Sequence, residues 1–404
     1  MDSRLVQQLI LVIVTTTIML LSTQFPPIVV GCMGVAFAVV LYFTTKIRYF
    51  GIGIAVLGLL YGIQFIPVSA FVGPIMMIVW GEVFRSAFDR FSKSIFVFGI
   101  GSGLALFVTM LYTNEFEPLV GVIALIVLLM LRSILKDRDD GAMISLIGVA
   151  MTIALFEDLQ FFVDYRTLAF AVALCAAFGY FAYRAKTIDL SGVFTAVLFG
   201  VILIIFANVM WFFVVMLFFI LGSIFTKFKY AKKKKMGVEQ RKSGRRGYMN
   251  AFANTGVGVA AAVLYGISGG DMIFAALFLG SIATATADTM ASEIGVVGGV
   301  PRLITTFKKC EPGTNGGVTI VGEAACLAGS IIVCGIAFAL GIVSWQVCLI
   351  CIIVGFIGTN LDSLYGALIE NRGLIGNSGT NLLATLSGGL IALLIYVLLS
   401  ANGL

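Results

Sequence analysis

The stretch "ATATADTMASEIG", Ala283 to Gly295, decides the class of fold because it closes an apolar segment with two carboxylates, Asp288 and Glu293. The chain around it is strongly apolar: of its 404 residues, 60% are hydrophobic and only 11% are charged. Soluble domains are about half apolar and about a quarter charged. Apolar runs long enough to cross a bilayer as helices recur along the whole length. The composition therefore predicts an all-α polytopic membrane protein.

The hydropathy pattern predicts about fifteen transmembrane segments. The opening segment is interpreted as the first span, since it lacks a convincing small-residue cleavage site for a signal peptide. The segments lie near residues 6–22, 28–45, 49–64, 67–83, 94–112, 118–135, 143–157, 167–183, 191–207, 209–225, 250–266, 272–287, 320–340, 345–360 and 382–400.

The distribution of positive charge predicts the orientation. With the N-terminus in the cytoplasm, alternating crossings place 25 of the 26 lysines and arginines inside, leave only Arg166 outside, and put the C-terminus outside. This asymmetry follows the positive-inside rule. The three connections richest in polar residues, 226–249, 288–319 and 361–381, then lie on the cytoplasmic face. We expect a multi-pass protein of the cell membrane with its active site on that face.

A change of composition near residue 185 predicts two regions. Before it, the loops are short and the spans are rich in Leu, Ile, Val and Phe. After it, Gly, Ala, Thr, Ser and Asn enter the spans, and such small and polar residues let helices approach closely and line cavities. We expect an accessory transmembrane region of unassigned role at 1–160 and a catalytic transmembrane domain at 165–404.

The absence of histidine excludes several chemistries. Histidine-based zinc sites, Ser-His-Asp triads and phosphatases with a histidine nucleophile cannot be built from this chain. The seven cysteines are scattered and mostly fall in apolar segments, where packing is their ordinary role. Carboxylates, arginines and glycine-rich turns are left to carry any reaction.

The first polar block is "KFKYAKKKKMGVEQRKSGRRGYMNAFANTG", Lys227 to Gly256. Its lysine run, 232–235, is typical of a juxtamembrane segment held on anionic lipid. Two arginines at a helix start, followed by two asparagines on one face of that helix, instead indicate a phosphate site beside free amide groups. The residues expected to bind nucleotide or phosphate here are Arg245, Arg246, Asn250 and Asn254.

The opening stretch is the second block, and it predicts a metal site. Ser281, Thr284, Asp288 and Ser292 follow helical steps of three and four, whereas Glu293 lies about 140° away from Asp288. The two acids can share a metal only if the helix unwinds, which the glycines that follow favour; otherwise Asp288 binds the metal and Glu293 has another role. Mg²⁺, held by carboxylates and substrate phosphates, suits this chemistry. We count Asp288, Glu293 and Lys308 as candidate catalytic residues.

The continuation of this block, "EPGTNGG" from Glu311 to Gly317, indicates a turn whose amides cradle phosphate. It lacks the Walker A spacing, and an ordinary turn has a similar composition. Its candidate phosphate-binding residues are Thr314, Asn315, Gly316 and Gly317. Glu323 lies inside the next span, where a carboxylate is a functional candidate.

The third block comprises "GTNLDSLYGALIENRG" and "GNSGTNLLATLSGG". Asp362 is interpreted either as a second metal or ribose contact or as an ordinary helix-end residue. The polar contacts expected around the site are Ser292, Glu323, Asn360, Asp362 and Asn381.

Four blocks in order, "GRRGYMNAFANTG", "ADTMASEIG", "PGTNGGVT" and "GTNLDSLYGA", resemble the phytyl-phosphate kinase family of tocopherol biosynthesis over residues 165–404. The resemblance implies an integral-membrane kinase that transfers the γ-phosphate of CTP to an isoprenoid monophosphate, with Mg²⁺. It makes Asp288 and Glu293 the metal-binding and catalytic acids. It makes Arg245, Arg246 and the turn at 314–317 the phosphate-binding groups. The expected partners are the isoprenoid monophosphate, the nucleotide and membrane lipids, without nucleic acid.

Two other functions use the same residue types. A CTP-dependent lipid-phosphate cytidylyltransferase would attach CMP and release pyrophosphate. A transporter or flippase for a phosphorylated lipid would also place polar groups in glycine-interrupted helices. The clustering of the polar blocks at one membrane face favours an enzyme.

Overall fold

The computed structural model describes residues 3–45, 47–88, 94–115, 117–239 and 244–401. It divides into two compact units, Met1–Tyr165 and Arg166–Leu404. Each unit is a bundle of helices and is described by itself below.

The described residues of the first unit form seven helices. Pro27 and Pro118 each occupy the first helical position, where a missing amide hydrogen is tolerated. Glu82 accepts hydrogen bonds from Arg85 and Arg132, which joins the fourth helix to the sixth. The helices are α1 (Ser3–Ser22), α2 (Pro27–Thr44), α3 (Arg48–Gly62), α4 (Val68–Ala87), α5 (Ile95–Thr113), α6 (Pro118–Leu135) and α7 (Gly141–Asp158).

The second unit contains the remaining helices and a small hairpin. In the hairpin, β1 (Arg302–Leu303) pairs with β2 (Gly317–Val318) in antiparallel register. The helices are α8 (Tyr165–Arg184), α9 (Leu190–Phe206), α10 (Val209–Lys227), α11 (Tyr230–Lys235), α12 (Tyr248–Ile267), α13 (Met272–Gly295), α14 (Ile320–Ala339), α15 (Trp345–Leu368), the 3₁₀ turn η3 (Glu370–Arg372) and α16 (Asn377–Ala401).

Local sequence explains where these helices begin. In a bilayer every backbone amide and carbonyl needs a partner within the protein, so apolar segments form helices. Several N-termini are capped by a side-chain oxygen that accepts a hydrogen bond from a free amide. The capping residues of α9, α10, α13, α14 and α15 are Asp189, Asn208, Asp271, Thr319 and Ser344.

The prediction of an all-helical membrane protein is confirmed. Within the described residues, twelve helices are long and apolar enough to cross a membrane. Three shorter apolar helices, Ile10–Ser22, Arg48–Gly62 and Leu190–Phe206, coincide with the other predicted segments. The count of fifteen crossings and the orientation of the termini stay predictions.

Helix α13 is the centre of the second unit. It contacts α10, α12, α14, α15 and α16, and 72% of its apolar stretch is buried. Small residues make this contact possible: a Cβ atom on Gly388 would overlap the hydroxyl of Thr284, and one on Gly280 would overlap Ala392. The small residues of the spans therefore serve close helix packing.

Two helices extend further than the hydropathy pattern predicts. Helix α13 continues to Gly295 rather than ending near 287, and α15 continues to Leu368 rather than ending near 360. No glycine or proline interrupts residues 281–294, so the backbone hydrogen bonds continue after the apolar residues end. Asp288, Glu293 and Asp362 consequently lie on helices and not in loops.

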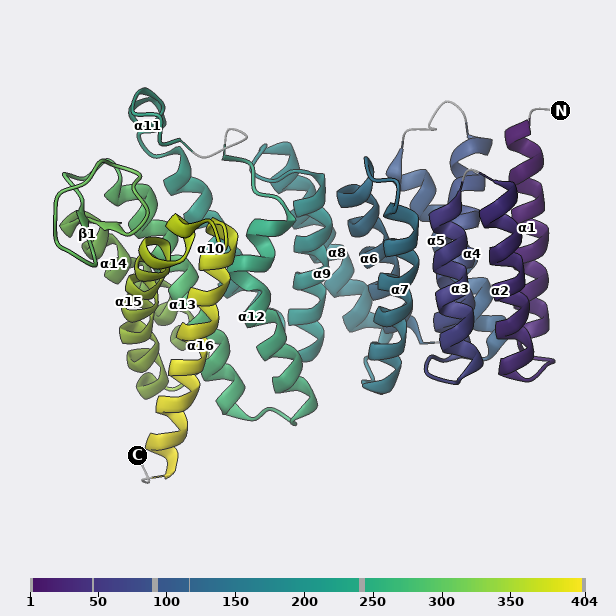
Figure 1. Cartoon of the computed structure of the whole chain (residues 1–404). Helices are drawn as coiled ribbons and strands as arrows, with labels where there is room; N and C mark the ends of the chain where they lie inside the picture. The colour runs from purple at the N-terminus through teal and green to yellow at the C-terminus, as the bar shows by residue number, and fades with distance from the viewer. Residues whose placement is uncertain (1–2, 46, 89–93, 116, 240–243, 402–404) are drawn as a thin grey trace. The chain divides into compact units, whose positions relative to one another are not determined.

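The polar segments gather at one end of the second unit. Figure 1 shows α11 and β1 at the same end of this unit and the last residues of α16 at the opposite end. The C-terminal ends of α13 and α15 and the N-terminal ends of α12, α14 and α16 belong to the same end as α11 and the hairpin. We call this the loop end.

Candidate functional site

Two aspartates meet at the loop end. The carboxyl groups of Asp288 on α13 and Asp362 on α15 interact with each other, and Thr380 at the start of α16, whose hydroxyl donates to the Asn377 carbonyl at 2.9 Å, lies beside Asp362. The Oδ1 atom of Asp362 is buried and has no hydrogen-bond partner among the described residues. Two carboxylates this close repel each other unless a proton or a cation lies between them. The pair is therefore a place where positive charge is needed.

Glu293 points elsewhere and has its own partner. The Lys233 ammonium of α11 donates to Glu293 Oε2 at 2.5 Å, and the Thr226 hydroxyl donates to Glu293 Oε1 at 3.0 Å. The side chains of Lys233 and Glu293 are only 1% and 5% exposed. Lys233 also donates to the Phe225 carbonyl at 2.9 Å, so this ion pair is desolvated and hydrogen-bonded on both sides.

The condition on which Asp288 and Glu293 were predicted to share a metal is not met in this structure. Sharing required the helix to unwind between them, and α13 is unbroken from Met272 to Gly295. Five residues of regular helix separate the side chains by about 140°. Asp288 faces Asp362 instead, and Glu293 is neutralised by Lys233.

Lys233 is a site residue that sequence reasoning missed. The lysine run 232–235 was expected to lie on lipid, yet Lys233 is fully buried and Lys232 donates to the Val297 carbonyl at 3.1 Å. Four consecutive lysines carry no signal for which one turns inward. The only indirect indication in the sequence was Glu293 at the end of an apolar segment, because a buried carboxylate needs a cation as partner.

The glycine-rich turn packs against the end of α15. Gly316 has φ +80, and a Cβ there would overlap Ala367 and the Ser363 carbonyl. The Asn315 side chain hydrogen-bonds to Glu370, while the Thr314 hydroxyl and the Gly317 amide bond within the turn. No backbone hydrogen bond from the amides of Asn315 and Gly316 is found among the described residues, and Gly316 itself is buried against α15.

The two neighbouring arginines have different surroundings. Arg245 is exposed, whereas the Arg246 guanidinium lies against Gly222 of α10 and over the ring of Phe218, 5.6 Å from its centroid. The Arg246 backbone is fixed by hydrogen bonds with Thr187 and Asp189. Burial lowers the pKa of Arg246 to about 10, opposed by the Glu293 carboxylate, so the guanidinium is charged at neutral pH.

The predicted asparagines join helices. Asn254 is buried, its amide donates to the Asn250 carbonyl at 2.8 Å, and Asn381 of α16 donates to Asn254 at 3.4 Å. In a second pair, Asn360 of α15 donates to Glu323 of α14 at 3.1 Å. These two pairs connect α12 to α16 and α14 to α15 at the loop end. Their positions fit a supporting role around the aspartates.

Two predicted residues lie at the surface. Lys308 is exposed in the hairpin, and no hydrogen bond or ion pair joins its ammonium to Asp288 or Glu293 in the described part of the chain. Ser292 is exposed and donates to the Thr289 carbonyl of its own helix at 3.2 Å. Thr380, absent from the predicted set, is buried beside Asp362.

Comparison with known proteins places the polar blocks within one region of similarity. The family model described as Integral membrane protein DUF92 matches residues 173–393. An uncharacterized membrane protein of Methanocaldococcus jannaschii is 34% identical over 220 residues, which cover 53% of this chain and 87% of the relative. That relative is therefore about 253 residues long (220/0.87), which leaves little length for a counterpart of the first unit.

Two plant proteins are also similar. Protein PGR of Arabidopsis thaliana is 33% identical over 233 residues, covering 51% of this chain and 80% of the relative. The chloroplastic protein VTE6 of the same plant is 28% identical over 199 residues, covering 47% of this chain and 60% of the relative. No solved structure matches this chain.

Proposed function

The chain belongs to the integral membrane protein family DUF92, and from this premise and the geometry of the loop end we propose that it is a membrane-embedded kinase. The proposed reaction transfers the γ-phosphate of CTP to an isoprenoid monophosphate and gives the prenyl diphosphate. Family membership agrees with the resemblance to phytyl-phosphate kinases carried by the four sequence blocks.

The observation that supports this proposal most is the pairing of Asp288 with Asp362. Neither residue has a cationic side chain as an ion-pair partner among the described residues, whereas Glu293 of the same helix has one. A carboxylate pair without a cationic partner, beside a glycine-rich turn, suits a substrate that arrives with a divalent cation. A purely structural pair would be expected to carry its own lysine, as Glu293 does.

Mg²⁺ fits the oxygen donors of this pair. Asp288 and Asp362 would hold it, with the buried Asp362 Oδ1 as a free donor atom. No group of three or more carboxylate, cysteine or histidine side chains suitable for a metal is present in the described residues. Mg²⁺ commonly binds through one or two carboxylates plus substrate phosphates, and two aspartates could supply the protein part of such a site. The bound ion would neutralise the nucleotide phosphates.

The remaining groups position anions. Phosphoryl transfer depends mainly on alignment and charge neutralisation, and a monophosphate acceptor is already an anion that needs no strong general base. The amides of Asn315 and Gly316 are proposed to hold nucleotide phosphate next to α15. The Lys233–Glu293 ion pair fixes α11 against α13, which holds the loop end together around the aspartates.

The test is turnover by the purified full-length protein in lipid nanodiscs. With CTP, Mg²⁺ and geranylgeranyl or phytyl monophosphate, we expect prenyl diphosphate and CDP in equal amounts. A CDP-linked lipid with pyrophosphate would identify a cytidylyltransferase instead. No turnover with any nucleoside triphosphate would overturn both enzyme assignments and favour transport.

A further inference from the structure

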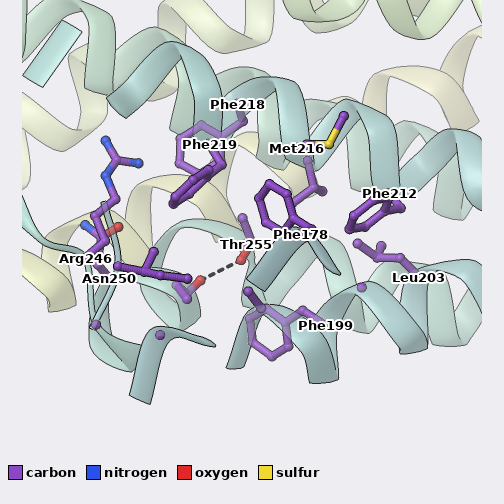
Figure 2. A pocket seen from close by; sticks show the side chains of 17 residues that line it. Phe178, Phe199, Leu203, Phe212, Met216, Phe218, Phe219, Arg246, Asn250 and Thr255 are labelled. Atoms are coloured by element: carbon purple, nitrogen blue, oxygen red, sulfur yellow. Dashed lines mark hydrogen bonds between the residues drawn. The ribbon is translucent and has the colours of Figure 1, made fainter. Parts of the chain in front are cut away.

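An apolar cavity lies within the second unit, and neither Asp288 nor Asp362 is among its lining residues. It is lined by residues of α8, α9, α10 and α12 and is partly open, so that the roughly 570 Å³ of empty space between them includes solvent at its mouth. Its walls are aromatic rings and aliphatic side chains, among them Phe178, Phe199, Phe212 and Phe219. Figure 2 shows these rings beside Leu203 and Met216. Such walls can bind a hydrocarbon chain, but they provide no hydrogen-bond donor or positive charge for a phosphate.

One end of the cavity is different because it carries a buried cation. Arg246 and Asn250 lie together there, at the opposite end from Leu203 and Phe212 (Figure 2). The Nη1 atom of Arg246 is buried and has no hydrogen-bond partner among the described residues. No ion pair to Arg246 is found among the described residues either. The Glu293 carboxylate acts on Arg246 electrostatically but is itself hydrogen-bonded to Lys233 and Thr226, so the buried guanidinium lacks a hydrogen-bonded anion.

Arg246 also connects the cavity to the loop end. Its guanidinium rests on Gly222 of α10, one helical turn before Thr226, and Thr226 donates to Glu293. The apolar part of the cavity extends from Arg246 between the spans. A molecule filling it would place its charged end at the loop end and its tail among the helices.

We propose that this cavity binds the hydrocarbon chain of a single-chain phosphate monoester, with the phosphate on Arg246 and Asn250. The inference rests on the proposed function, since an isoprenoid monophosphate acceptor has this chemistry. The small-residue contacts around α13 are closed by packing, so the acceptor tail lies along the aromatic wall instead. Arg246 holds the acceptor phosphate, and the aspartate pair serves the nucleotide.

Binding is tested without nucleotide, so that the result does not depend on turnover. The full-length protein in nanodiscs is photolabelled with a prenyl monophosphate carrying a diazirine in its tail, and the labelled residues are identified by mass spectrometry. We expect label on cavity residues of α9, α10 and α12. Geranylgeranyl monophosphate should displace it, and inorganic phosphate or the uncharged prenol should displace it at least about tenfold less well, a difference of about 1.4 kcal/mol.

Two variants with matched controls separate the tail site from the phosphate site. Ala251→Phe fills the cavity from α12 and should reduce labelling at least about fivefold, while Ala260→Phe, on an exposed face of the same helix, should leave it unchanged. Arg246→Gln should remove the preference for monophosphate over prenol, while the exposed Arg184→Gln should retain it.

Three outcomes would overturn the inference. They are label outside the cavity, full labelling of Ala251→Phe, and displacement by phosphatidic acid but not by prenyl monophosphate. A protein that is labelled as expected but transfers no phosphate would overturn only the kinase proposal. A protein that transfers phosphate but is labelled elsewhere would overturn only this inference.

Discussion

Asp288 and Asp362 present two carboxyl groups to the same point between α13 and α15, and the chain provides them with no lysine or arginine partner in its described part. Glu293, five residues away, is instead enclosed by Lys233 and Thr226. Acidic side chains on α13 therefore have two different surroundings: Asp288 faces another carboxyl group, and Glu293 faces a lysine. The sequence identified all three acids as important but could not assign their partners, because partners come from other helices.

Removing one carboxylate of the pair should stop the reaction. We expect Asp288→Asn and Asp362→Asn each to lower kcat by about a hundredfold or more, since charge stabilisation of a transferring phosphoryl group is lost. Neither should lower the thermal stability, because the substitutions relieve repulsion. Asp137→Asn, an exposed aspartate of the first unit, is the matched control. Full activity of either site variant would contradict the assignment.

Breaking the Lys233–Glu293 ion pair should destabilise the fold. Lys233→Met and Glu293→Gln each leave a buried group uncompensated, which costs about 3–5 kcal/mol in comparable pairs. We expect both single variants to unfold at lower temperature in detergent, and the double variant to lose much less than the sum. Additive losses in this double-mutant cycle would show that the two side chains do not interact.

At the scale of elements, the runs of apolar residues predicted every long helix in the described part of the chain, because membrane helices are marked by hydropathy. The polar ends of these helices were not predicted. The apolar residues stop at the membrane surface, whereas the backbone hydrogen bonds of a helix can continue beyond it. Thus α13 and α15 each extend about two turns beyond the apolar run. This extension places Asp288 opposite Asp362 and prevents the unwinding that Glu293 would need to join them.

An unbroken α13 has a measurable signature. Amide hydrogen exchange of residues 288–294 should be nearly as slow as that of the preceding turns, because those amides are donors within a buried helix. Exchange many times faster from residue 289 onward would show that the helix opens there. It would then restore the shared-metal arrangement of Asp288 and Glu293.

The glycine-rich turn depends on one backbone position. Gly316→Ala places a Cβ against Ala367 and Ser363 at φ +80, so the turn must move away from α15. We expect the KM for nucleotide to rise about tenfold, with a smaller effect on the KM for the lipid acceptor. Gly376→Ala, where a Cβ meets nothing, is the control. An unchanged nucleotide KM would exclude the turn from the phosphate site.

At the scale of the whole molecule, the chain combines a region shared with its family and a first unit outside it. The family match begins at residue 173, close to the division between the two units at Tyr165. Composition alone suggested a change of character in this region, because small and polar residues enter the spans there. The role of the first unit stays unassigned, since the family match does not include it.

The orientation of the loop end follows from the distribution of charge and is open to direct labelling. In a protein with Cys32 and Cys310 replaced, Thr305→Cys probes the hairpin and Ser268→Cys probes the opposite end of the second unit. A membrane-impermeant maleimide should label Ser268→Cys on intact cells and Thr305→Cys only after permeabilisation, since the positive charge favours a cytoplasmic loop end. The reverse pattern would put the loop end outside, away from cellular nucleotides.

The central claim, transfer of a terminal phosphoryl group to a prenyl phosphate, is tested most directly by following the label of CTP. The reconstituted protein is given geranylgeranyl monophosphate, Mg²⁺ and CTP labelled with ³²P at either the γ or the α position, and the lipid fraction is counted. A kinase carries the γ label into the lipid and leaves the α label in CDP, and Asp288→Asn abolishes the transfer. Appearance of the α label in the lipid, or of neither label, would contradict the account.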